Sequence, residues 1–222
     1  MKLQAVGNDF IVADAGKIAV KRPKTHSLAR LARAICDRHT GVGADGFLLV
    51  LPPQNRENHA QVRFFNADGG EAEMSGNGIR CVGGFLAEKR RRAPALRIET
   101  LAGVKTLEKM SGEAERWIFR VAMGWPVLEP EKIPFTGPGA SAPVLNYPLP
   151  TNQGKRRVTV TSMGNPHCSL FVSDFHRINW RAVGQEIETN SYFPNRTNVE
   201  FIKVISEREI EVRYWERGVG QT

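Results

Sequence analysis

The sequence predicts an α/β (α+β) protein built from two domains that share one plan. Its 222 residues suit two domains of about 110 residues each. Short strand-like segments alternate with a few helix-like ones in both halves. Between the halves, residues 125–144 are dense in proline, which cannot donate to a central sheet ladder, so we expect a linker or crossover there. We therefore place one domain at residues 1–120 and the second at residues 121–222.

The first half is expected to combine strands with two helices. Amphipathic spacing predicts a helix over 27–39, with Ser27 as its N-cap, and a second helix from about Gly76 to Arg91. The last three strands are spaced like a meander or barrel. The expected strands are 9–15, 47–51, 60–70, 95–100, 104–110 and 116–124.

The second half repeats this plan. Strands are expected within 156–172 and at 198–206 and 209–222, with a short helix near 179–188. Each half has a strand that ends in a polar, glycine-rich turn, "FFNADGGEAEMSGNG" in the first and "RYWERGVGQT" in the second. The first of these turns opens a helix. If the halves mirror each other, we expect the second domain to be C-terminally incomplete, with an exposed apolar interior.

Composition limits the location and the partners. Hydrophobic residues make up 41% and charged residues 24% of the chain, as in folded globular proteins. No stretch approaches the roughly 20 apolar residues of a membrane span, and the start lacks a signal-peptide pattern. We expect a cytoplasmic protein with no membrane partner.

The net charge of +8 raises the question of nucleic acid binding. The densest basic run, "EKRRRA" at 88–93, closes a predicted helix, where cations favour the helix dipole. No aromatic residues interleave with it as a base-stacking surface would need. We expect no nucleic acid partner, whereas a basic surface suits small dianionic substrates.

The chain contains three cysteines, Cys36, Cys81 and Cys168. They form no CxxC pair and their number is odd, so neither a disulfide framework nor a zinc site is indicated. We expect reduced thiols and no metal.

The triplet Ser75-Gly76-Asn77 stands at the start of the second predicted helix. The first backbone N–H groups of a helix lack acceptors within it, and the helix dipole adds positive charge. Such a start can hold a carboxylate or phosphate. The alternative is that Ser75 is only an N-cap, because serine is among the best capping residues.

Asparagines recur at the predicted strand ends and loops. An amide both donates and accepts hydrogen bonds, which suits a ligand that carries an ammonium and a carboxylate. Glu216 and Arg217 add one charge of each sign. The pattern indicates a polar cage for an amino acid, formed by Asn8, Asn66, Asn77, Asn165 and Asn198.

Six ordered motifs together resemble the diaminopimelate epimerase family over essentially the whole chain. They are "GNDF", "RHTGVGADG", "FFNADGGEAEMSGNGIRC", "SMGNPHC", "FPNRTNVEF" and "YWERGVGQT". The resemblance implies two pseudo-symmetric domains, each a β-barrel or roll around a central helix, with the active site between them. It also implies cofactor-free interconversion of LL- and meso-diaminopimelate for lysine and peptidoglycan synthesis, by one thiolate and one thiol.

The resemblance also implies roles for residues of this chain. Ser75 falls at the position of the first catalytic cysteine, and His167 and Glu216 match residues that support the proton transfers. The substrate-binding positions match Asn8, Asn66, Gly76, Asn77, Asn165, Asn198, Glu216 and Arg217. The implied partner is a small diamino-dicarboxylate, and a homodimer is left open.

The chain departs from the family pattern at both catalytic thiols. A serine hydroxyl is a far poorer base than a thiol unless a neighbour takes its proton. The second cysteine is expected shortly after Thr222. Cys81 lies six residues beyond Ser75, on the packing face of the helix, and is a poor substitute. Cys168, next to His167, stays open as a candidate.

Three readings follow from these observations. The first is a diaminopimelate epimerase that is weakly active or inactive as given. The second is a catalytically silent homologue that binds an amino acid. The third is another racemase or isomerase of the same superfamily.

Overall fold

The computed structural model describes residues 1–17, 24–89, 94–113 and 116–221. The chain divides into two compact units, Met1–Met123 and Gly124–Thr222. Each unit has its own sheet and its own buried apolar core.

Unit 1 (Met1–Met123) is built on an eight-stranded sheet with the order β1-β2-β3-β4-β6-β7-β8 and β5 paired to β4. Its helices are η1 (Ala15–Lys17), α1 (Thr25–Cys36) and α2 (Gly76–Lys89). The strands are β1 (Lys2–Ala5), β2 (Asn8–Asp14), β3 (Gly46–Leu51), β4 (Ala60–Asn66), β5 (Glu71–Ala72), β6 (Ala95–Thr100), β7 (Gly103–Glu113) and β8 (Arg116–Ala122).

Helix α1 covers one face of this sheet. Strands β2 and β3 are parallel, so the chain must cross over between them, and α1 lies in that connection. Its buried residues Leu28 and Ala32 pack in one cluster with Phe47 and Leu49 of β3. Alternate residues of β3 point to opposite faces, which leaves Leu48 and Val50 for the other side.

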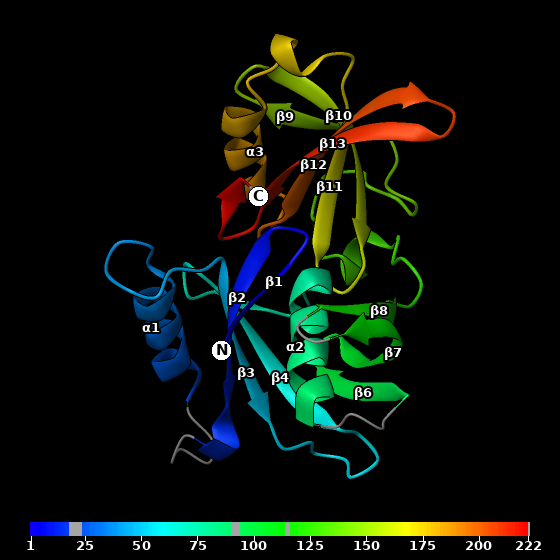
Figure 1. Cartoon of the computed structure of the whole chain (residues 1–222). Coiled ribbons are helices and arrows are strands. Elements are labelled where there is room, and N and C mark those ends of the chain that lie inside the picture. The colour runs from blue at the N-terminus through cyan, green and yellow to red at the C-terminus, as the bar shows by residue number, and fades with distance from the viewer. Residues whose placement is uncertain (18–23, 90–93, 114–115, 222) are drawn as a thin grey trace. The chain divides into compact units, whose positions relative to one another are not determined.

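Helix α2 covers that other side. Ile79, Val82 and Leu86 of α2 belong to one buried cluster with Leu48 of β3 and Phe64 of β4. Figure 1 shows the sheet curling so that β6, β7 and β8 pass α2 on the side away from β3 and β4. The expected roll around a central helix is therefore present in unit 1.

The boundaries of α1 correct two predictions. The helix begins at Thr25 with Lys24 in the capping position, so Ser27 lies inside its first turn and is not the N-cap. The backbone N–H of Ser27 already donates to the carbonyl of Lys24, at 3.0 Å. The helix ends at Cys36, short of His39, because the Asp37 carboxylate accepts hydrogen bonds from the next backbone amides and forms a turn.

Most predicted strands agree with the structure to within a few residues. The segment 60–70 is shorter than expected, because the chain turns after Asn66, with Gly69 at a φ of 82°. Strand β1 (Lys2–Ala5) was not predicted from the sequence. The predicted helix end at Arg91 and most of the basic run 88–93 lie outside the described residues.

Unit 2 (Gly124–Thr222) has a six-stranded sheet with the order β14-β13-β12-β11-β10-β9. Its helices are η2 (Pro130–Lys132), η3 (Phe175–Arg177) and α3 (Trp180–Glu188). The strands are β9 (Tyr147–Thr151), β10 (Gly154–Ser162), β11 (Pro166–Phe171), β12 (Asn198–Ser206), β13 (Glu209–Glu216) and β14 (Gly220–Gln221).

The two sheets share a topology. In unit 1, β1–β2 is antiparallel, β2–β3 parallel and β3–β4 antiparallel. In unit 2, β10–β11, β11–β12 and β12–β13 repeat that order. Helix α3 lies between β11 and β12 in the chain, as α1 lies between β2 and β3. The predicted mixed α/β fold with pseudo-symmetric halves is confirmed.

The proline-dense stretch 125–144 is part of the unit 2 core, and its interpretation as a linker or crossover was wrong. Ile133, Phe135 and Val144 are buried in the same cluster as Val160 of β10 and Ile187 of α3. Within these described residues Val127 forms an isolated bridge with Ser162 of β10, and the apolar side chains of the stretch pack against the sheet.

The sheet of unit 2 also carries apolar side chains on the face opposite α3. Phe171 is 67% exposed, Val204 59% and Ile210 57%. Phe171 follows Leu170 of the buried core along β11, and Val204 of β12 pairs with Ile210 of β13. The equivalent face in unit 1 is the one that α2 covers.

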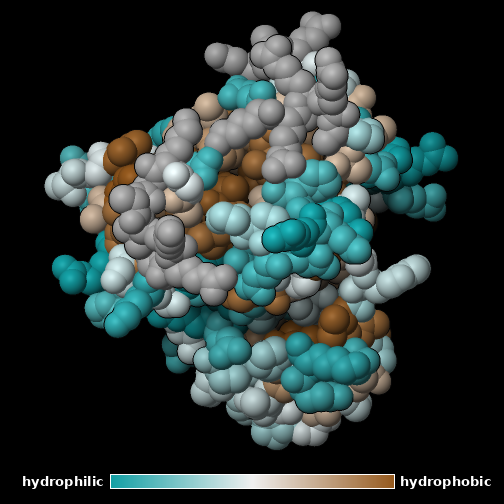
Figure 2. All heavy atoms as spheres, turned by 90° about the horizontal axis from the view of Figure 1, so that it is seen from below, coloured by the Kyte–Doolittle hydropathy of each residue, from teal (hydrophilic) through white to brown (hydrophobic). Residues whose placement is uncertain are grey.

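None of the described helices combines the length and apolarity that a membrane crossing requires. Figure 2 shows one face of the molecule, on which hydrophilic and apolar residues are interspersed.

Candidate functional site

Unit 1 places Ser75 directly before the first residue of α2. The hydroxyl oxygen of Ser75 accepts a hydrogen bond from the backbone N–H of Gly78 at 3.0 Å, and the Ser75 carbonyl accepts from Ile79 at 2.9 Å. This is the geometry of a serine N-cap. The structure thus confirms the capping role, and the same residue stands at the position that the motifs assign to a catalytic group.

The helix start is open on one side. A Cβ added to Gly76 would meet only the Cε of Met123, at 4.0 Å. At Gly78, by contrast, a Cβ would lie 3.1 Å from Phe64 and from Ser75. The backbone amides of Gly76 and Asn77 therefore begin a helix with space beside them, which suits an anionic ligand group.

A chain of hydrogen bonds joins β2 to α2. Asn8 is buried, and its Nδ2 donates to the Asp45 carboxylate at 2.8 Å. Its Oδ1 accepts from the Nδ2 of Asn77 at 3.3 Å. Arg80 donates in turn to the Oδ1 of Asn77. These bonds fix the orientation of both site amides.

The turn before β2 brings Asn8 to this position. Val6 and Gly7 have φ values of 56° and 85°, as a two-residue hairpin turn requires. Asn8 then starts β2, and Asn66 ends β4 opposite Gly46, the first residue of β3. Asn8, Asn66 and the start of α2 therefore lie at one end of the unit 1 sheet.

Charged residues support this end of the sheet. Asp9 pairs with Lys2 at 2.9 Å and with Arg38 at 2.8 Å, and Arg38 also contacts Asp45 at 2.7 Å. Burial raises the pKa of Asp9, but the hydrogen bonds from Arg38, Lys2 and the backbone of Asp45 outweigh it and hold that pKa well below its usual range. The Asp45 carboxylate that orients Asn8 is thereby fixed by Arg38.

Unit 2 brings His167 between two partners. Its Nδ1 lies 2.5 Å from the Oε1 of Glu200, and its Nε2 lies 2.9 Å from the Oδ1 of Asn165. The Oε2 of Glu200 accepts from the hydroxyl of Ser169 at 3.2 Å. His167 lies in β11, and hydrogen bonds to Glu200 and Asn165 fix the orientation of its ring.

Asn198 organises the turn that carries Glu216 and Arg217. Its Oδ1 accepts from the backbone N–H of Arg217 at 2.9 Å, and its Nδ2 donates to the carbonyl of Pro166 at 3.1 Å. The guanidinium of Arg217 donates to the carbonyl of Asn195 at 3.0 Å, and Arg217 is only 9% exposed. Asn198 thus links three strands at one end of the unit 2 sheet.

The buried carboxylate of Glu188 holds the same turn from α3. It accepts hydrogen bonds from the Nε1 of Trp215 at 2.7 Å and from the backbone N–H of Gly218 at 3.0 Å, and Arg196 lies 3.4 Å from it. Its side chain is 9% exposed. The turn with Glu216 and Arg217 is therefore anchored on both sides.

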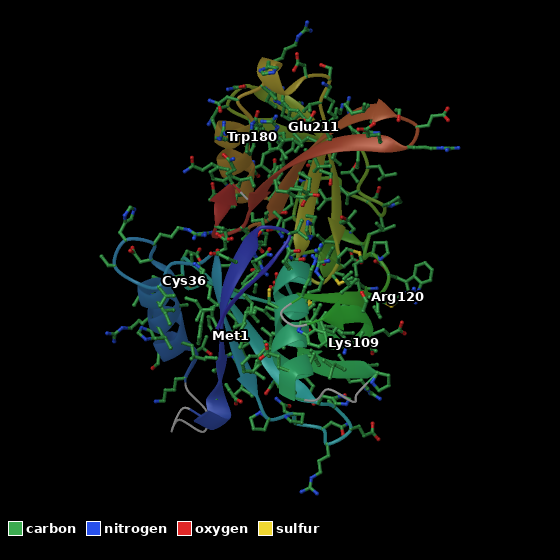
Figure 3. The ribbon with its side chains drawn as sticks, viewed as in Figure 1. Met1, Cys36, Lys109, Arg120, Trp180 and Glu211 are labelled. Atoms are coloured by element: carbon green, nitrogen blue, oxygen red, sulfur yellow. The ribbon has the colours of Figure 1, made fainter. Side chains whose placement is uncertain are left out.

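All three cysteines are buried, and burial disfavours the thiolate form of each. Burial raises the pKa of Cys36 to about 11, with the charges of Asp9 and Asp45 adding to the shift, and burial raises the pKa of Cys81 to about 12. Burial also raises the pKa of Cys168 well above its usual value. Cys168 points into the unit 2 core, on the face opposite His167. This position argues against Cys168 as a substitute for a catalytic thiol. Figure 3 shows Cys36 at the end of α1.

The described residues contain no group of three or more metal-ligating side chains that could hold an ion. The groups at the two sheet ends are amides, a hydroxyl, helix-start N–H groups, a histidine and paired charges. Groups of these kinds hydrogen-bond to the charged ends of small polar molecules.

The fold is shared with two solved structures. A hydroxyproline epimerase from Agrobacterium vitis matches 99% of this chain with a TM-score of 0.70 at 14% identity, and 70% of that chain is covered. A probable proline racemase from Agrobacterium radiobacter K84 matches with a TM-score of 0.71 at 15% identity, over 99% of this chain and 70% of its own.

The family follows from closer relatives. The diaminopimelate epimerase family model matches residues 1–129 and 159–222. The diaminopimelate epimerase of Pelotomaculum thermopropionicum is 46% identical over the whole of this chain and 77% of its own length, and that of Halothermothrix orenii is 43% identical over 76% of its length. The chain belongs to the diaminopimelate epimerase family and is an isomerase by family.

Sequence reasoning missed three acidic residues that support the site: Asp45, Glu188 and Glu200. Asp45 and Glu200 lie within motifs that the sequence reading quoted, but no pattern shows which side chain a carboxylate will contact. Glu188 lies at the end of the short helix, and its burial and its hydrogen bonds to Trp215 and Gly218 reveal its role.

Proposed function

We propose that this chain binds diaminopimelate through the amides and helix start of unit 1 together with the polar residues of unit 2. The contributing residues are Asn8, Asn66, Gly76 and Asn77 from unit 1 and Asn165, Asn198, Glu216 and Arg217 from unit 2. The observation that carries the proposal is the Asn8–Asn77 contact beside an open helix start, since it joins two motif residues 69 positions apart.

The proposed roles follow the chemistry of each group. The open amides at Gly76 and Asn77 favour a substrate carboxylate and the negative charge that develops on it when the α-proton leaves. Glu216 and Arg217 offer one charge of each sign to an ammonium and a carboxylate. His167 and Glu216 support the proton transfers.

We propose further that the chain with Ser75 epimerises slowly or not at all. The Ser75 hydroxyl is a poor base, and its oxygen already accepts a bond from Gly78. All three cysteines are buried. A chain that binds the amino acid without turnover, the second candidate function, is favoured by the same observations.

The test begins with binding. Calorimetric titration of the chain with LL- and meso-diaminopimelate should give saturable binding, with lysine as a poorer ligand because it lacks the second carboxylate. Gly76→Ala should fold normally, since its Cβ meets open space, yet weaken binding by about tenfold by crowding the ligand. Glu88→Ala, an exposed change near the other end of α2, is the matched control and should bind as the parent does.

Proton exchange tests the chemistry. Incubation with LL-diaminopimelate in deuterated water should show little α-deuterium incorporation with the Ser75 chain and more with Ser75→Cys, because a thiolate is a usable base near neutral pH. An absence of saturable binding would overturn the proposed function. Rapid exchange by the Ser75 chain would overturn the inactive reading, and binding without exchange by either protein would favour the silent homologue.

The remaining parts of the proposal concern context. We place the chain in the cytoplasm, in lysine and peptidoglycan biosynthesis, which is supported by the names of its relatives and by three cysteines without a disulfide. A homodimer is proposed as the assembly to test by light scattering during gel filtration.

A further inference from the structure

The carboxylate of Glu200 is nearly buried, and each of its oxygens contacts a polar side chain of β11. Its side chain is 10% exposed, Oε1 lies 2.5 Å from His167 Nδ1, and Oε2 accepts from Ser169 at 3.2 Å. A buried carboxylate is costly unless its hydrogen-bond partners compensate. The short contact to His167 is the stronger of the two compensating bonds.

The fold itself does not require a polar pair at these positions. The parallel register sets His167 opposite Asn198 and Ser169 opposite Glu200. In unit 1 the same register sets Phe10 opposite Gly46 and Val12 opposite Leu48, and three of these four belong to the apolar cluster around α2. The shared topology therefore tolerates apolar residues where unit 2 has His167, Ser169 and Glu200.

We propose that Glu200 is a positioning residue of the ligand site, which rests on the proposed function. An ionised carboxylate can only accept hydrogen bonds, so Glu200 holds a proton on Nδ1 of His167 and fixes the plane of the ring. Nε2 is then presented to Asn165, at 2.9 Å.

The ring in turn selects the face of the Asn165 amide that meets the ligand. When both ring nitrogens carry a proton, Nε2–H donates to Asn165 Oδ1, and the amide NH₂ points away to donate to a carboxylate. With Nε2 as an acceptor, the amide reverses and its oxygen points away to accept from an ammonium. Glu200 thus restricts Asn165 to orientations set by a single ring nitrogen. Ligand binding then costs less conformational entropy, because the Asn165 amide is already ordered.

The first readout is the protonation pattern of the His167 ring, measured without ligand. Long-range proton–nitrogen NMR spectra distinguish Nδ1–H from Nε2–H rings, and His167→Gln assigns the signals among the five histidines. The parent should show a proton held on Nδ1. Glu200→Gln should shift the ring toward the Nε2–H form, since a neutral amide is a weaker acceptor.

Two further variants separate positioning from general structure. Glu200→Asp keeps the charge and should restore the Nδ1 proton in part. Ser169→Ala removes only the weaker bond to Glu200 and should leave the His167 ring as in the parent. If Glu200→Gln does not fold, the Glu200→Asp variant decides. Its shorter side chain reaches His167 less well, so the Nδ1 proton should be held only in part. A His167 ring and a diaminopimelate affinity equal to those of the parent would contradict the proposal.

The second readout is diaminopimelate affinity. Glu200→Gln should weaken binding by about tenfold, as expected for one charge-assisted hydrogen bond, and Ser169→Ala by less than about twofold. An unchanged His167 ring and unchanged affinity in Glu200→Gln would overturn the inference. If the ring changes but the parent itself binds no diaminopimelate, the proposed function fails while the hold of Glu200 on His167 stands.

Discussion

The hydroxyl oxygen of Ser75 accepts a hydrogen bond from the backbone N–H of Gly78 at 3.0 Å. The residue at the motif position of a catalytic base therefore stabilises the helix that carries the site. Ser75→Ala should lower the free energy of unfolding by about 1 kcal/mol, the usual cost of losing a serine N-cap, and Ser75→Gly by only a few tenths. Urea denaturation followed by circular dichroism measures both.

Ser27 provides the matched control, because the sequence predicted it to be a cap and the structure places it inside the first turn of α1. Ser27→Ala should be neutral or slightly stabilising, since alanine is the better helix former. A loss at Ser27 equal to that at Ser75 would mean that the capping geometry at Ser75 is not what stabilises α2.

Thiol reactivity follows from the burial of the cysteines. With the pKa of Cys36 at about 11 and that of Cys81 at about 12, little thiolate forms at pH 8. The native chain should react slowly with a disulfide reagent such as Ellman's, and three thiols should react after denaturation. Ser75→Cys should add one rapidly reacting thiol, because a partly exposed cysteine at a helix start has a lowered pKa.

The Ser75→Cys result also bears on proton exchange. A fast thiol that supports no α-proton exchange would show that position 75 is accessible without being aligned with a bound ligand. A slow thiol would show instead that the helix start is closed.

The sequence predicted the strand and helix pattern well because local periodicity controls it. The segment 198–206 was predicted with the bounds that the structure has. Tertiary contacts explain the failures. The apolar residues of 125–144 gave no strand or helix pattern, yet Ile133 and Phe135 pack in the core of unit 2.

The candidate site divides in the same way. Motif order predicts Asn8, Asn77, Asn165 and His167 as site residues, because chemistry at such a site demands particular residue types. The carboxylates that hold them could not be predicted, since the contacts of Asp45 and Glu200 depend on which strands become neighbours. Side-chain partners across a sheet follow register, which one sequence does not give.

Glu188 should be important for the stability of unit 2. Its carboxylate is buried and accepts hydrogen bonds from Trp215 and Gly218. Glu188→Gln should lower the free energy of unfolding by about 2 kcal/mol. The glutamine amide has only one oxygen, so it can accept only one of the two hydrogen bonds. Thermal denaturation followed by tryptophan fluorescence measures the loss.

Glu211 is the control for Glu188. It lies on β13 in Figure 3, and its pairing with Arg213, at 3.3 Å, is exposed. Glu211→Gln should change stability by less than about 0.5 kcal/mol, as is usual for a surface ion pair. Equal effects of the two changes would contradict a special role for Glu188.

Asp9 should make stability depend on pH in the acid range. Burial raises the pKa of Asp9, but Arg38 and Lys2 lower it by more, so its folded value lies below the unfolded value of about 3.9. A depressed pKa contributes stability that is complete above pH 4 and is lost as the pH falls through the folded value. Asp9→Asn should therefore cost about 1–2 kcal/mol at pH 6 and progressively less from pH 4 to pH 2.

The same pH series on an exposed carboxylate separates this local effect from general acid unfolding. Glu207 lies in the exposed turn between β12 and β13, so the difference between Glu207→Gln and the parent should stay near zero over the whole range. A constant cost of Asp9→Asn from pH 6 to pH 2 would mean that shape rather than charge holds Asp9. The salt dependence gives a second check, since Arg38 is 54% exposed and added salt should weaken its pairing with Asp9.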